Sequence, residues 1–177
     1  MSKSVQYVLI SICLIMLVSC NSKTHFTLNE LIEEVNEIKL NIDGDIAVAF
    51  LDLSNEENQI LINNTKSFHA ASTMKVPVMI ELFKQQTEKK LSLNDSIVLK
   101  NKFKSIVDGS LYKMDIGDDS DDIAYSKIDT KQRLYDLMYS MITVSSNLAT
   151  NVLIELVGAK NTTATMRSLG ADKIEIL

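Results

Sequence analysis

The sequence predicts a single domain that mixes α-helices with β-strands. Several segments carry apolar residues at helical spacing, while residues 45–63 show a strand–turn–strand pattern. The chain has 177 residues, of which 46% are hydrophobic and 23% charged, which suits one globular domain with its own core. The net charge of −5 argues against a nucleic-acid partner, because phosphate binding needs a basic surface.

The first elements form a helix followed by a hairpin. Residues 28–40 place apolar side chains at helical spacing with glutamates between them, which predicts an amphipathic helix. Residues 45–53 read as a strand, residues 54–58 as a turn, and residues 59–63 as the antiparallel partner. Because a two-stranded hairpin alone is marginal in water, further strands are expected elsewhere.

The rest of the chain is mainly helical in pattern. A helix is predicted from Ser72 to about Lys89, apolar nearly all round in its first half and therefore buried, with Pro77 in its first turns. Further helices are predicted over residues 130–141, 148–157 and 161–169. Residues 174–177 resemble the start of an extended segment.

The N-terminus has the pattern of a lipoprotein signal. An apolar stretch over residues 8–16 ends in Leu17-Val18-Ser19-Cys20, which resembles the bacterial lipobox. We therefore expect a signal peptide over 1–19, a lipidated tether over 20–27 with the lipid on Cys20, and the folded domain over 28–177. This places the protein in the bacterial cell envelope, held to the membrane by its lipid and facing the periplasm or the exterior. A plain secretory signal or an anchor helix is the alternative.

Processing at this site would remove thiol chemistry from the mature chain. Cys13 leaves with the signal and Cys20 carries lipid, so no cysteine remains for a disulfide, a metal or nucleophilic catalysis. The two histidines are His25, in the tether, and His69, which are too few for a zinc site. These absences favour a serine nucleophile whose base is a lysine.

Ser72 and Lys75 supply that pair. Residues at i and i+3 share one face of a helix, so the hydroxyl and the amine can meet. An ordinary lysine with a pKa of about 10.4 would need about 4.6 kcal/mol to be neutral at pH 7, and burial reduces that cost. The alternatives are a serine that caps a helix and a solvated lysine.

Two polar segments follow downstream. Ser145-Ser146-Asn147 lies between two helical patterns, as part of a site or as caps and turn formers. The acidic run Asp115–Asp122 lacks the ligand spacing of an EF-hand, which favours a solvated surface turn over a calcium loop.

With these motifs in order, the chain from about Leu28 to Leu177 resembles the N-terminal part of a class A serine beta-lactamase. The resemblance implies an α/β (α+β) sandwich of helices packed on an antiparallel sheet, acting on beta-lactam antibiotics as a monomer without cofactor or metal. Ser72 would be the nucleophile, and its backbone N–H would form half of the oxyanion hole. Lys75 would be its base, Ser145 would relay a proton to the lactam nitrogen, and Asn147 with Ser146 would bind substrate.

The sequence also departs from that family. Ser146 stands where class A enzymes usually carry aspartate, and penicillin-binding proteins have an SxN motif there. The omega loop with its deacylating glutamate, the KTG strand and the remaining sheet strands are not among these residues, so we expect the 177-residue chain alone to be inactive. The alternatives are a DD-peptidase-like enzyme acting on peptidoglycan peptides and a non-catalytic lipoprotein with the same fold.

Overall fold

The computed structural model describes residues 27–105 and 108–176. The predicted signal peptide and the lipidation site at Cys20 lie outside these residues. The chain divides into two compact units at the boundary between Phe68 and His69. In the described residues no helix is both long enough and apolar enough to cross a membrane.

The first unit contains one helix and one hairpin. Helix α2 (Leu28–Leu40) has the predicted bounds and begins with a capping box, in which Thr27 and Glu30 satisfy each other's backbone N–H groups. Strands β1 (Val48–Leu51) and β2 (Gln59–Ile62) pair antiparallel. The first strand is shorter than the predicted 45–53.

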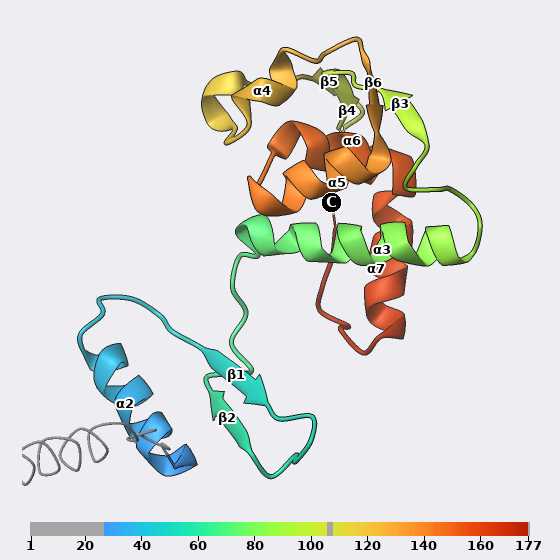
Figure 1. The fold of residues 1–177 in the computed structure, drawn as a ribbon. Helices are drawn as coiled ribbons and strands as arrows, with labels where there is room; N and C mark the ends of the chain where they lie inside the picture. Colours follow the sequence, from blue (N-terminus) through green and yellow to red (C-terminus); the bar gives the residue numbers. More distant parts are fainter. Residues whose placement is uncertain (1–26, 106–107, 177) are drawn as a thin grey trace, which may run out of the picture. The chain divides into compact units, whose positions relative to one another are not determined.

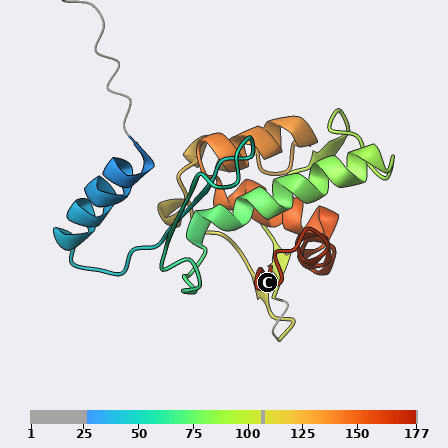
Figure 2. The ribbon, with the colours of Figure 1, turned by 90° about the horizontal axis from the view of Figure 1, so that it is seen from below.

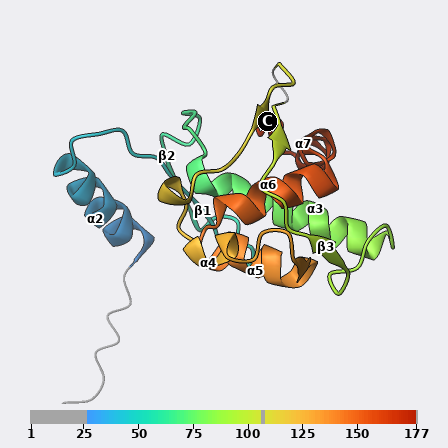
Figure 3. The ribbon, with the colours of Figure 1, turned by 90° about the horizontal axis from the view of Figure 1, so that it is seen from above.

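The second unit is built on four helices that pack together (Figures 1, 2 and 3). They are α3 (Lys75–Thr87), α5 (Leu134–Thr143), α6 (Asn147–Val157) and α7 (Ala159–Ser168). α3 contacts each of the other three. The apolar core between them is fully buried, and its members include Val78, Leu82, Met141, Leu148 and Leu153.

Short strands and helices connect α3 to α5. β3 (Ser96–Val98) pairs antiparallel with β6 (Lys131–Arg133), and β4 (Phe103–Lys104) pairs with β5 (Leu111–Tyr112). The 3-10 turn η2 (Ile116–Asp118) and the short helix α4 (Asp122–Tyr125) follow β5.

The single helix predicted over residues 130–141 is wrong at its start. Residues 131–133 form β6, and α5 begins only at Leu134. The backbone explains the change, because the N–H groups of Leu134 and Tyr135 donate to the carbonyls of Asp95 and Leu93 rather than to their own helix. Long-range pairing therefore overrides the local helical pattern.

Helix α3 is less uniformly buried than predicted. A 3-10 turn, η1 (Ala71–Met74), precedes it, and Pro77 lies in its first turn, where the missing N–H costs little. Val76 and Phe83 are 45% and 44% exposed, although both were expected in the core. The buried face carries Glu81 and Gln85 among its apolar residues.

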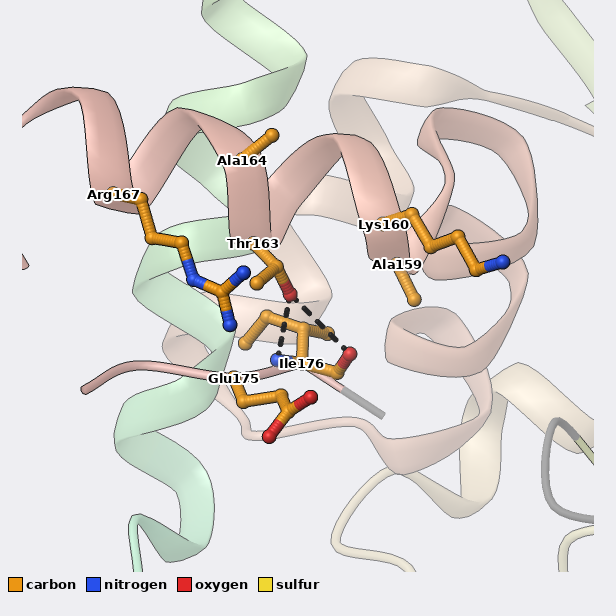
Figure 4. A pocket seen from close by; sticks show the side chains of 7 residues that line it. All are labelled: Ala159, Lys160, Thr163, Ala164, Arg167, Glu175 and Ile176. Carbon is orange, nitrogen blue, oxygen red and sulfur yellow. Dashed lines mark hydrogen bonds between the residues drawn. The ribbon is translucent and has the colours of Figure 1, made fainter. Parts of the chain in front are cut away.

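A hollow of about 500 Å³ lies between α7 and the last described residues (Figure 4). Its lining includes Arg167 and Glu175. The backbone N–H of Ile176 donates to the Thr163 hydroxyl at 3.0 Å, which fixes this segment against α7. Residues 174–176 belong to neither a helix nor a strand, so the extended start predicted for residues 174–177 stays a prediction.

Candidate active site

Ser72 and Lys75 meet as their spacing predicts. Ser72 lies in η1 and is exposed, whereas Lys75 opens α3 and is only 4% exposed. The Lys75 Nζ lies 3.2 Å from the Ser72 Oγ. A reachable hydroxyl therefore sits beside a buried amine, the arrangement that an activated serine requires.

Lys75 also contacts the second predicted motif. Its Nζ lies 2.7 Å from both the backbone oxygen and the Oγ of Ser145, and 2.9 Å from the Asn147 Oδ1. The Ser145 Oγ is in turn 2.9 Å from the Ser72 Oγ. The structure thus brings Ser72 and Lys75 together with Ser145 and Asn147, a pair that lies 70 or more residues later in the sequence.

These contacts leave a neutral Lys75 amine able to act as a base, although an ammonium ion could donate to the same oxygens. Two of the Lys75 partners, the Ser145 carbonyl and the Asn147 Oδ1, can only accept hydrogen bonds. A neutral amine has two N–H groups, which these acceptors use, and one lone pair, which is left to accept a proton from a hydroxyl. That hydroxyl is Ser72 directly, or Ser145, through which a proton from Ser72 can pass.

The environment of Lys75 favours the same protonation state. Burial lowers the pKa of Lys75 below its ordinary value, and the nearby carboxylate of Asp119 partly opposes this by raising it. The net direction is downward. A base with a lowered pKa is neutral in a larger fraction of molecules near pH 7.

Two residues at the site have left-handed backbone conformations. Ala71, just before the nucleophile, has φ of +44°, and Ser145 has φ of +60°. Such conformations cost a non-glycine residue roughly 1–2 kcal/mol. At Ser145 this turn carries both the carbonyl and the hydroxyl that face Lys75.

The substrate-binding role expected for Ser146 gains no support from its position and stays a prediction. Its side chain is completely buried, and its hydroxyl accepts the backbone N–H of Ala149 at 3.2 Å, so it caps α6. Asn147 does face the site, with its Oδ1 on Lys75 and its Nδ2 donating to the Asp118 carbonyl at 3.0 Å.

Most of the acidic run is exposed, as expected of a surface turn, but Asp119 makes specific contacts within the fold. Asp119 is partly buried, and its two carboxylate oxygens accept the backbone N–H groups of Asn147 and Leu148 at 2.9 and 2.7 Å. Tyr125 also donates to it at 3.1 Å. Burial raises the pKa of Tyr125, and the hydrogen bond to Asp119 raises it further, so the phenol stays protonated and donating.

His69, the other candidate base, makes a different contact. The His69 Nδ1 accepts the backbone N–H of Ala71 at 3.2 Å, which braces the turn before Ser72. Among the residues that the structure describes, no group of three or more His, Cys, Asp or Glu side chains is placed to hold a metal ion.

Comparison with known proteins identifies the fold and the family. Residues 29–177 match the profile of the beta-lactamase enzyme family. The chain belongs to this family. Curated protein sequences give no significant match.

Several solved structures share the fold. A beta-lactamase from Sphaerobacter thermophilus is 26% identical with a TM-score of 0.63, over 78% of this chain and 47% of the other. An ancestral class A beta-lactamase is 22% identical with a TM-score of 0.65, over 82% and 51%. PBP-A is 20% identical with a TM-score of 0.65, over 83% and 51%. The chain thus spans about half the length of these structures, and the predicted class A beta-lactamase-like fold is confirmed.

Proposed function

We propose that this beta-lactamase family member opens beta-lactams through an acyl-enzyme on Ser72, and so acts in antibiotic resistance. The observation that carries the proposal is the buried Lys75 amine, whose four oxygen partners include the exposed nucleophile and Ser145. Membership of the beta-lactamase family supports the substrate class. A mutant of the structural neighbour PBP-A forms an acyl-enzyme complex with penicillin G.

In the proposed acylation the Ser72 Oγ forms a bond to the lactam carbonyl carbon. Its proton moves to the Lys75 Nζ, either across their 3.2 Å contact or through the Ser145 hydroxyl. The tetrahedral oxyanion receives a hydrogen bond from the Ser72 backbone N–H. The carbon–nitrogen bond then breaks, Ser145 gives its proton to the leaving nitrogen, and Lys75 returns a proton to Ser145. Water later hydrolyses the ester.

A DD-peptidase-like activity on peptidoglycan peptides is the second candidate. The observation that favours it is Ser146, which gives the motif a serine in its middle position and serves only as a helix cap. Both activities share the acylation step and differ in how fast the acyl-ester is hydrolysed. The lifetime of the penicillin adduct therefore distinguishes them.

Labelling of the complete gene product with a fluorescent penicillin tests the proposal. We expect one covalent adduct on Ser72, no adduct in Ser72→Ala, and labelling slowed by about 10²–10⁴-fold in Lys75→Ala, which lacks the base. Mass spectrometry would locate the adduct, and nitrocefin turnover would report deacylation. An adduct on another residue in Ser72→Ala would refute the mechanism. The 177-residue chain alone should show no sustained turnover.

We also propose that the protein is a lipoprotein of the cell envelope, anchored through Cys20. The support is the sequence Leu17-Val18-Ser19-Cys20 after an apolar stretch. Radiolabelled palmitate should enter the wild-type protein and not Cys20→Ser, which should also leave the membrane fraction. Cys13→Ser is the matched control and should remain labelled.

A further inference from the structure

The first turn of α6 is held by a side chain from outside the predicted motifs. A helix begins with backbone N–H groups that have no partner within the helix. Ser146 caps that of Ala149, and the Asp119 carboxylate accepts those of Asn147 and Leu148. The whole N-terminal turn is therefore satisfied by two residues, one of them 28 positions upstream of Asn147.

The same segment restrains the side chain of Asn147. Its Nδ2 donates to the Asp118 carbonyl, which turns its Oδ1 toward the Lys75 Nζ. Asp119 is itself held in place, because its Oδ1 accepts the backbone N–H of Asp121 and its Oδ2 accepts the Tyr125 hydroxyl. A rigid connection thus runs from the 118–121 segment to the lysine.

We propose that Asp119 is a positioning residue of this site, holding Asn147, and through the preceding turn Ser145, against Lys75 in the geometry that Ser72 acylation requires. This inference rests on the proposed function. Asp119 touches neither Ser72 nor the reacting atoms. It acts through the backbone that carries two of the lysine's partners.

The charge of Asp119 also affects the pKa of Lys75, an effect that a purely structural residue would not have. Among the described residues, Asp119 is the carboxylate that raises the pKa of Lys75 against the effect of burial. The acidic groups Asp115 and Asp118 act with it on Tyr125. Removing the Asp119 charge should therefore lower the pKa of Lys75. The acylation rate, which rises with pH as Lys75 loses its proton, should then rise at lower pH.

The test compares three variants of the complete gene product by fluorescent-penicillin labelling across pH. Asp119→Asn keeps the shape but turns an NH₂ toward one N–H of α6. We expect the maximal acylation rate to fall by roughly 10- to 100-fold and the rise of the rate with pH to shift to lower pH. Asp119→Glu keeps the charge but displaces the carboxylate. Acylation should therefore slow, while the pH at which its rate rises should stay unchanged. The matched control is Asp122→Asn, because Asp122 is an exposed acid of the same acidic run. It should match wild type in the maximal labelling rate and in its pH dependence.

Two measurements do not depend on lactam chemistry. A ¹³C NMR titration of Lys75 should show a lower pKa in Asp119→Asn, and amide hydrogen exchange at Asn147 and Leu148 should be faster. If wild type is not labelled by penicillin, the proposed function is wrong and these two measurements decide the inference. Unchanged labelling in both Asp119 variants, or unchanged titration and exchange, would overturn it. If Asp119→Asn does not fold, wild-type acylation in Asp119→Glu would overturn it.

Discussion

Replacing Thr165 by valine should weaken the joint between α3 and α7 without changing its volume. Glu81 is 2% exposed, and its carboxylate accepts the Thr165 hydroxyl at 2.5 Å and the Gln85 Nε2 at 2.7 Å. The Thr165 hydroxyl also accepts a hydrogen bond from the Lys84 Nζ at 2.7 Å. Thr165→Val leaves the buried Glu81 Oε2 without its hydroxyl donor, and the Lys84 Nζ, 3.9 Å away and partly exposed, is the ion-pair partner that remains.

The expected loss in the free energy of unfolding is about 2 kcal/mol, because a hydrogen bond to a charged group contributes about 1.5–3 kcal/mol. That corresponds to a melting temperature lower by about 4–8 °C in a protein of this size. Thr162→Val on the same helix is the matched control. Thr162 is also buried, but its hydroxyl donates only to the Gly158 carbonyl of its own helix, so its loss should stay below about 1 kcal/mol.

Urea unfolding of wild type and both variants, followed by circular dichroism, measures the two free energies. Both substitutions replace a hydroxyl by a methyl and keep the β-branch, so helix propensity and packing volume cancel in the comparison. A difference between the variants below about 0.5 kcal/mol would show that Glu81 does not depend on Thr165.

Three further predictions concern the backbone and the base. Gly158→Ala should cost about 1–2 kcal/mol in urea unfolding, because Gly158 has φ of +86° and a Cβ there would lie 2.9 Å from Asn161; Gly44→Ala, where a Cβ meets nothing within 4 Å, should be nearly neutral. Ser145→Gly should unfold about 1 kcal/mol less readily than Ser145→Ala, since only glycine relieves the left-handed backbone, while both label slowly with penicillin. The wild-type labelling rate should rise with pH and level off below the ordinary lysine pKa of about 10.4, because burial lowers the pKa of Lys75 and only the neutral amine accepts a proton. A labelling rate that levels off only at the ordinary lysine pKa would contradict a lowered pKa for Lys75.

The elements that the sequence predicts best are those whose signals are local. α2 has its predicted bounds because Thr27 and Glu30 form a capping box next to an amphipathic repeat. β6 has no such signal, since Lys131–Arg133 is polar and becomes a strand only by pairing with β3 from more than thirty residues earlier. Its neighbour α5 was therefore predicted to begin too early.

The site divides in the same way. Ser72 and Lys75 were predictable because their contact follows from helix geometry alone. Ser145 and Asn147 were found as polar residues within apolar helical sequence. The burial of Ser146 could not be predicted, because the exposure of neighbouring turn residues depends on how the turn is oriented. Its preference for helix caps was the signal that pointed to its observed role.

Asp119 shows why the outer part of the site could not be predicted from sequence. It is one aspartate among several in a polar run, and the neighbouring Asp118 and Asp122 are exposed. What distinguishes Asp119 is the position of the α6 N-terminus, whose two N–H groups it accepts, and that position is set by packing of the helical core. A carboxylate is favoured at such a terminus because it meets both free donors and the positive end of the helix dipole. The nucleophile and its base are thus specified by adjacent residues, whereas the support of their partners depends on the assembled fold.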